Sequence, residues 1–120
     1  QSEVLFESGE AVLNPLGETQ LAQLAGTLKQ IAGEIPDDID WILRVDGHTD
    51  ERPISTFQFP SNWELSSARA ISVVKFLVGQ GIPPEKLVAA GFGQFQPIDP
   101  GRDEIAYLRN RRIEFKLDQR

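Results

Sequence analysis

Residues Val45–Leu77 read VDGHTDERPISTFQFPSNWELSSARAISVVKFL, and this stretch decides the fold. It opens on the end of an alternating segment and passes through a loop punctuated by Gly47, Pro53 and Pro60. It then continues with apolar residues at helical spacing. A strand that leads through a loop into a helix is typical of an α/β protein, in which the helix packs back on the sheet.

The helical part of this stretch carries its own start and stop signals. Ser61–Glu64 reads SNWE, the S-x-x-E form of a capping box, so we expect the helix to begin at Ser61. Gly79 or Gly81 is expected to end it. One stripe at helical spacing is small or apolar and should face the core: Ser66, Ala70, Val73, Val74 and Leu77.

Two other segments alternate in the manner of half-buried strands. In Trp41–Gly47 and in Arg112–Leu117, every second residue is apolar and most residues between them are polar. Such strands form a sheet with helices on one face and water on the other. The side expected to face the helices carries Trp41, Leu43, Val45, Ile113, Phe115 and Leu117, and the other side carries Ile42, Arg44, Asp46, Arg112, Glu114 and Lys116.

Weaker patterns fill in the rest of the chain. Val4–Phe6 is interpreted as a short strand, and Asn14 as the N-cap before Pro15 of a helix that Gly33 and Pro36 end. That helix should bury Leu16, Leu21, Leu24, Leu28, Ile31 and Ile35. The later elements expected are a turn at Pro83–Lys86, a strand near Leu87–Ala90, a loop marked by Gly91, Gly93 and Pro97, and a helix near Glu104–Arg109. The prediction is one α/β domain over residues 1–120, a two-layer α+β sandwich whose mixed β-sheet has helices packed on one face.

Composition limits the function classes. The 120 residues, 40% of them apolar and 25% charged, suffice for one globular domain with its own core. No run is long enough to span a membrane, and no signal peptide opens the sequence. The absence of Cys excludes disulfides, thiol catalysis and Cys-based zinc sites. The net charge of −6 argues against a general affinity for nucleic acid.

Asp50 and Arg69 are the main candidates for a binding site. Asp50 follows the strand that ends near Gly47, and Arg69 lies on the same helix stripe as Asn62 and Leu65. A carboxylate that accepts from an ammonium, beside a guanidinium that binds a carboxylate, would hold a zwitterion. The alternative is that the two side chains form a structural ion pair with each other. Spacing alone leaves both interpretations open.

Other chemistries have weaker support. His48 beside Asp50 would suit a hydrolase, but no Ser or Cys nucleophile in a recognisable turn accompanies it. One imidazole and scattered carboxylates lack the spacing of a ligand set, so no metal site is predicted. Gly91–Gly93 lacks the third glycine of a dinucleotide loop. Arg109–Arg112 would suit nucleic-acid phosphates, but it lies in an acidic chain with few aromatic neighbours, which favours a role at the start of a strand. Arg109 is expected to add positive charge near Asp50.

Four motifs resemble the OmpA/MotB-type peptidoglycan-binding domain: GHTD (Gly47–Asp50), N-x-x-L-S-x-x-R-A-x-x-V-x-x-x-L (Asn62–Leu77), GIP (Gly81–Pro83) and NRRIE (Asn110–Glu114). The resemblance spans Phe6 to Leu117 and implies a βαβαβ-type fold that binds peptidoglycan stem peptides without catalysis or a cofactor. Diaminopimelate, the main ligand of the family, carries both an ammonium and a carboxylate at its free end. The resemblance therefore favours the ligand interpretation of Asp50 and Arg69.

Residue by residue, the resemblance implies that Asp50 takes the ligand ammonium and Arg69 its carboxylate. Asn62 and Leu65 match positions in the groove, and Thr49 neighbours the aspartate. Further positions are matched by Arg109 and Phe6.

The segment between the aspartate and the arginine, ERPISTFQFPSNWELSSA (residues 51–68), is longer than in many outer-membrane members and resembles the MotB branch. Members of that branch carry an N-terminal membrane helix and anchor an ion-driven motor stator to the cell wall. Outer-membrane proteins and the lipoprotein Pal use the same module as a passive tether. The resemblance, together with a first residue that is not Met, implies a periplasmic C-terminal domain of a longer protein. That parent would be tethered to the inner or outer membrane, homodimeric and without nucleic acid.

Overall fold

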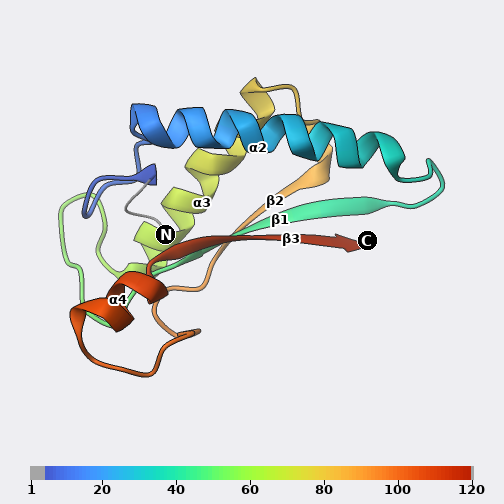
Figure 1. The fold of residues 1–120 in the computed structure, drawn as a ribbon. Helices are drawn as coiled ribbons and strands as arrows, with labels where there is room; N and C mark the ends of the chain where they lie inside the picture. The colour runs from blue at the N-terminus through green and yellow to red at the C-terminus, as the bar shows by residue number, and fades with distance from the viewer. Residues whose placement is uncertain (1–4, 120) are drawn as a thin grey trace.

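A three-stranded sheet lies beneath two long helices in the computed structural model, which describes residues 5–119 (Figure 1). The central strand is β1 (Trp41–His48). On one side β2 (Leu87–Gly91) runs parallel to it, and on the other β3 (Arg112–Gln119) runs antiparallel. The mixed sheet predicted from the sequence is confirmed.

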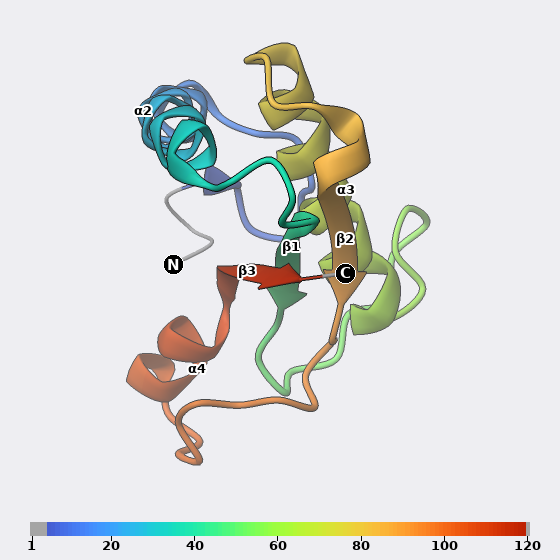
Figure 2. The ribbon, with the colours of Figure 1, turned by 90° about the vertical axis from the view of Figure 1, so that its right-hand side faces the viewer.

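The two long helices cover one face of this sheet. They are α2 (Pro15–Glu34) and α3 (Asn62–Gly79), and the 3-10 turn η1 (Pro84–Lys86) follows α3 and leads into β2. The short helix α4 (Glu104–Asn110) lies on the opposite side of the sheet from α2, next to the start of β3 (Figures 1 and 2). Within residues 5–119, no helix combines the length and the apolar character needed to cross a bilayer.

Helices α2 and α3 begin where the capping signals predicted. The Asn14 side chain accepts a hydrogen bond from the Gly17 N–H at 2.7 Å, and Pro15 is the first helical residue. The Ser61 hydroxyl accepts from the Trp63 N–H at 3.2 Å. Asp103 caps α4 in the same way. These side chains satisfy backbone donors that the first turn of each helix leaves without a partner.

The core lies between the helices and the inner face of the sheet, and its predicted membership is largely correct. Of the predicted stripe on α3, all but the partly buried Val74 are fully buried. Three predicted core residues are exposed instead: Leu16 by 58%, Ile31 by 41% and Leu117 by 55%. Leu16 lies in the first turn of α2. Ile31 and Leu117 both line an apolar groove between α2 and the edge of the sheet, so each keeps access to solvent.

The predicted N-terminal strand is wrong within the part of the chain that the structure describes. Val4 lies outside the described residues, and Phe6 makes only an isolated antiparallel bridge with Leu13. The apolar signal reflects burial instead, because the Phe6 side chain is 1% exposed in the core.

The outer face of the sheet was expected to be open to water, and at the end of β1 it is not. Asp46 is 1% exposed and His48 is 5% exposed. The Phe92 ring stacks on the His48 ring at 5.0 Å between centroids. The segment that follows β2 therefore covers this end of the outer face.

Candidate ligand-binding site

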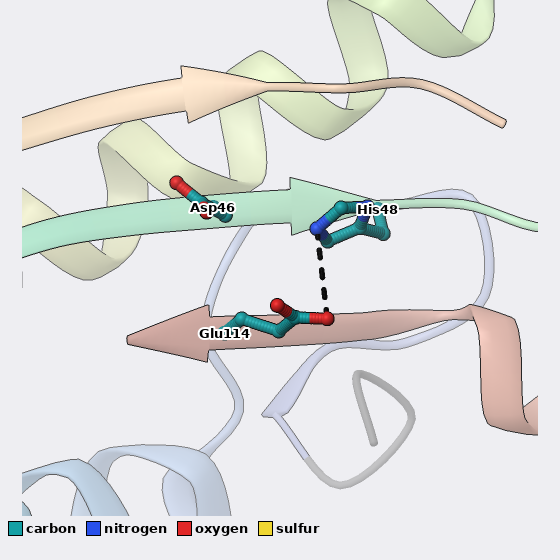
Figure 3. Close-up of side chains that lie close together, drawn as sticks. All are labelled: Asp46, His48 and Glu114. Atoms are coloured by element: carbon teal, nitrogen blue, oxygen red, sulfur yellow. Dashed lines mark ion pairs between the residues drawn. The ribbon is translucent and has the colours of Figure 1, made fainter. Parts of the chain in front are cut away.

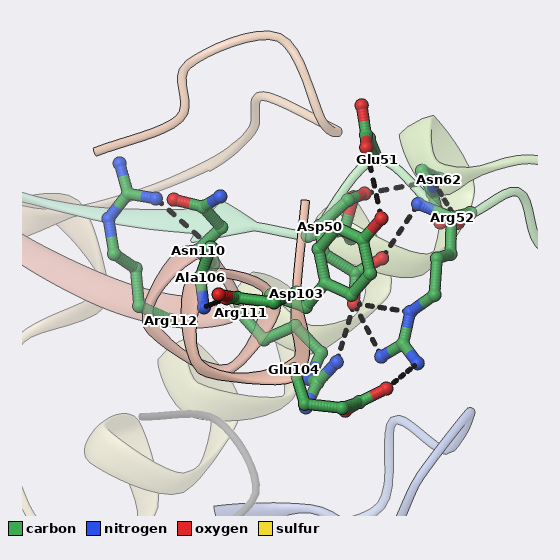
Figure 4. Close-up of polar contacts among 12 residues, drawn as sticks. Asp50, Glu51, Arg52, Asn62, Asp103, Glu104, Ala106, Asn110, Arg111 and Arg112 are labelled. Atoms are coloured by element: carbon green, nitrogen blue, oxygen red, sulfur yellow. Dashed lines mark hydrogen bonds and ion pairs between the residues drawn. The ribbon is translucent and has the colours of Figure 1, made fainter. Parts of the chain in front are cut away.

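The loop after β1 places the Asp50 carboxylate where two arginines hold it. Its Oδ1 accepts from the Arg52 backbone N–H at 2.8 Å. Its Oδ2 accepts from the Arg52 side chain at 2.8 and 3.1 Å and from Arg111 Nη1 at 2.5 Å (Figure 4). Charge-assisted bonds of this kind are short and directional, so the 5% exposed carboxylate has a fixed orientation.

These contacts also determine the charge of Asp50. Burial on its own would raise the pKa of this carboxyl, but the hydrogen bonds from Arg52 and Arg111 outweigh burial, and the pKa lies below its usual value. Asp50 is therefore a carboxylate at neutral pH. It is the acceptor that an ammonium would need.

Helix α3 supplies a second group of side chains on one stripe. Asn62, Leu65 and Arg69 stand three and four residues apart and are each less than 10% exposed. Arg69 Nε donates to the Glu10 carbonyl oxygen at 2.7 Å, and Nη2 donates to the Glu7 carbonyl oxygen at 3.2 Å. The arginine thereby ties the segment before α2 to α3.

Asn62 joins the loops on either side of the site. Its Nδ2 donates to the Arg52 carbonyl at 3.1 Å and to Gln94 Oε1 at 3.0 Å, with a longer contact of 3.4 Å to the Asp50 carbonyl (Figure 4). Thr49 donates its hydroxyl to the same Asp50 carbonyl at 3.0 Å. The backbone that carries Asp50 is thus held from two directions.

These residues line one pocket of about 250 Å³. Five predicted site residues, Thr49, Asp50, Asn62, Leu65 and Arg69, lie around it. Its remaining lining residues are Ser8, Gly9, Arg52, Pro53, Ile54 and Arg111. The lining carries three guanidinium groups and one carboxylate, so the pocket has a local excess of positive charge in a chain whose net charge is −6. An anionic group is favoured there.

Arg109 is not where the sequence analysis placed it. Its guanidinium lies 3.1 Å from Asp99, is 61% exposed, and does not line this pocket. Arg111 takes the expected place beside Asp50. Helix α4 ends at Asn110, and Arg111 has extended backbone angles. Its direction therefore follows from the helix end, which the run of arginines in the sequence does not reveal. Arg52 was also missed, although its position two residues after Asp50 was a usable signal.

The other sequence candidates lie elsewhere. His48 lines a different cavity, on the outer face of the sheet, and is not part of the Asp50 pocket. Arg112 donates to Glu114 and to the carbonyl oxygens of Asn110 and Gln96. The arginines of the segment Arg109–Arg112 are therefore engaged in contacts within the domain.

Comparisons with known proteins agree on one family. The model of the OmpA family matches residues 5–111. The uncharacterized protein YtxE of Bacillus subtilis is 39% identical over 118 residues, which cover 98% of this chain and 46% of YtxE. This chain thus spans less than half the length of that relative.

Two solved structures share the fold. The periplasmic domain of Helicobacter pylori MotB has a TM-score of 0.83 and 27% identity, covering 98% of this chain and 72% of that one. The cell wall anchor of the type VI secretion system (T6SS) from Pseudomonas aeruginosa has a TM-score of 0.81 and 30% identity, covering 96% of this chain and 75% of that one.

Proposed function

The chain belongs to the OmpA family, and from this premise we propose that the domain binds peptidoglycan through the pocket between Asp50 and Arg69. The observation that carries the proposal is the composition of the pocket. A buried carboxylate lies among three guanidinium groups, next to the apolar side chain of Leu65. A ligand with an ammonium and a carboxylate on one aliphatic chain complements these groups.

Diaminopimelate in a stem peptide has that chemistry. Its ammonium would approach Asp50 Oδ1, which accepts one hydrogen bond from Arg52 and as a carboxylate oxygen has a second acceptor position. Its carboxylate would bind Arg69. Thr49 and Asn62 position the loop that carries Asp50, and Leu65 packs on the aliphatic part of the ligand. Arg109 has no contact role in this proposal because it lies outside the pocket.

The role is one of attachment, without catalysis. The wall-hydrolase alternative needs His48 and Asp50 in one site, and they line different cavities. Incubation with purified sacculi should therefore release no soluble muropeptides. The nucleic-acid alternative needs free cations at Arg109–Arg112, and Arg109, Arg111 and Arg112 bind Asp99, Asp50 and Glu114. DNA and RNA should show no retardation at physiological salt.

In the intact protein, the domain would lie in the periplasm and hold a longer membrane protein to the wall. The similarity to the MotB periplasmic domain and to the T6SS cell wall anchor supports this role. A homodimer, as in motor members of the family, is compatible with the pocket, and light scattering of the domain and of the longer protein tests it.

The test is calorimetric titration of a stem peptide that contains diaminopimelate, beside the same peptide with lysine in its place. We expect the first peptide to bind and the second to bind much more weakly, because lysine lacks the distal carboxylate. Asp50→Asn and Arg69→Lys should each weaken binding by about 1.5–3 kcal/mol, or roughly 10–150-fold.

Arg109→Lys is the matched control for Arg69→Lys. It makes the same chemical change outside the pocket and should leave the affinity unchanged. Circular dichroism of each variant establishes that it is folded. Equal affinity for the two peptides, or no binding by the unsubstituted domain, would refute the proposal.

A further inference from the structure

A second group of polar side chains lies on the outer face of the sheet, away from the Asp50 pocket. Asp46 and His48 are two residues apart on β1 and therefore point to the same face. In the register of the sheet, Asp46 lies directly opposite Glu114 of β3. One nitrogen or oxygen atom from each of Asp46, His48 and Glu114 lies within 4.8 Å of the other two (Figure 3).

The histidine in this group is buried without hydrogen bonds to its ring nitrogens in the described part of the chain. Its ring is 5% exposed, and neither Nδ1 nor Nε2 has a hydrogen-bond partner in the described part of the chain. Nε2 faces Glu114 Oε2 at 3.8 Å, too far for a hydrogen bond (Figure 3). Stacking on Phe92 explains the position of the ring and leaves both nitrogens unpaired. Buried polar atoms without a partner are rare and costly.

The two carboxylates lie directly opposite each other on neighbouring strands. Arg44 pairs with Asp46 and Arg112 pairs with Glu114, so the arginines offset the repulsion that like charges in this position produce. All three side chains line one cavity of about 450 Å³, so an ion has both room and an entry path.

We propose that Asp46, His48 and Glu114 bind a transition-metal cation such as Zn²⁺. An imidazole nitrogen with two carboxylate oxygens is a recognised ligand set for zinc, with further positions left for water. In a tetrahedral zinc site with bonds of about 2.0–2.2 Å, two ligand atoms lie about 3.3–3.6 Å apart. The three ligand atoms, which lie within 4.8 Å of one another, would have to approach by up to about 1.5 Å, and rotation of the side chains would supply this movement.

The neighbouring cations shape this site and limit its affinity. Arg44 donates two hydrogen bonds to Asp46, at 2.7 and 3.0 Å, and Arg112 donates one to Glu114 at 2.5 Å. These bonds orient the carboxylates as outer-shell partners do, and each carboxylate keeps further lone pairs. Their positive charge, with that of Lys116, opposes a cation. Selectivity should therefore depend on the imidazole and favour Zn²⁺ or Ni²⁺ over Mg²⁺.

The sequence analysis predicted no metal site because no ligand spacing was visible along the chain. The ligands come from two strands, His48 and Glu114 are 66 residues apart in sequence (114 minus 48), and only the strand register brings them together.

The test uses untagged protein stripped of metal, since the chain contains one His and no Cys. Calorimetric titration with Zn²⁺ at pH 7 should give one equivalent bound, and Mg²⁺ should give none. His48→Gln removes a direct ligand and should weaken Zn²⁺ binding by at least the roughly 10–100-fold that loss of an outer-shell partner costs. Glu85→Gln, which removes an exposed carboxylate outside the site, is the control and should bind as the unsubstituted protein does.

A second measurement needs no variant. Because the sequence contains one histidine, one set of imidazole signals is expected, and Zn²⁺ should shift the ring nitrogen resonance of His48 in the unsubstituted domain. Unchanged imidazole signals at saturating Zn²⁺, or equal affinities of the unsubstituted protein and His48→Gln, would overturn the proposal and assign any binding to surface carboxylates.

Discussion

The two faces of β1 differ sharply over two successive residues. On the helix-covered face, a Cβ added at Gly47 would lie 2.2 Å from the Ser66 carbonyl oxygen, so the strand and α3 touch through their backbones. On the outer face, His48 lines a cavity and has two unpaired ring nitrogens. The packed face fixes the position of α3 and hence of Arg69. The outer face keeps a cavity, and no hydrogen-bond partner within residues 5–119 serves the two ring nitrogens of His48 there.

The largest loss of stability is expected from a substitution that disrupts the contact between β1 and α3. In Gly47→Ala, the new methyl group would overlap the Ser66 carbonyl, and backbone atoms have no alternative rotamer to adopt. We expect a loss of about 3 kcal/mol or more in the free energy of unfolding, the upper range for overpacking. Urea denaturation followed by circular dichroism measures it.

Gly26→Ala is the matched control for this substitution. Gly26 lies within α2, and a Cβ there would meet nothing within 4 Å. Alanine in the helix interior should stabilise the domain by about 0.5–1 kcal/mol. If Gly47→Ala were as stable as the unsubstituted protein, the close approach of α3 to β1 would be wrong.

A smaller loss is expected from the pocket, where the polar groups satisfy one another. Asp50→Asn replaces the carboxylate that Arg52 and Arg111 share by a neutral amide of similar size. Because hydrogen bonds to charged groups contribute more than neutral ones, we expect a loss of about 1.5–3 kcal/mol in the free energy of unfolding at pH 7.

The pH dependence of the free energy of unfolding tests whether the charge of Asp50 causes this loss. The pKa of Asp50 is lower in the folded than in the unfolded state, so its stabilising effect is complete above about pH 4, the unfolded value. It is lost as the pH falls through the folded pKa. The difference in stability between the unsubstituted protein and Asp50→Asn should therefore be constant near neutrality and shrink in acid. A difference that stayed constant into acid would show that the charge of Asp50 is not the cause.

Capping residues and apolar stripes predicted the fold well because each depends only on residues that are close together in the sequence. The capping residues Asn14 and Ser61 and the stripe on α3 act within one helix, and each predicted element after Pro15 is present. The motif also placed five residues around one pocket. By contrast, the direction of Arg111 depends on where α4 ends, and the burial of Asp46 depends on the segment after β2.

The ligand set on the outer face was beyond reach of the sequence for the same reason. Alternation along β3 predicted that Glu114 is on the outer face, but the strand it pairs with and the register of the pair are properties of the whole sheet. A shift of one residue would have moved Glu114 to the other face. Long-range register is the information that the single sequence lacks.

The smallest change in the free energy of unfolding is expected from a substitution on the outer face, at His48. The groups around its ring are Asp46, Glu114, Arg112 and Lys116, with Phe92 stacked on it. The pKa of His48 is lowered in the folded state. As the pH falls below about 6.5, the unfolded chain therefore binds a proton that the folded protein does not, and stability decreases until the folded pKa is reached. His48→Gln should lack this slope between pH 6.5 and 5, measured by urea denaturation at several pH values.

Addition of Zn²⁺ sharpens the comparison, since an ion bound only by the folded state stabilises the unsubstituted protein and competes with the proton. An identical pH slope in both proteins, with and without Zn²⁺, would mean that the outer face is as inert as the packed one.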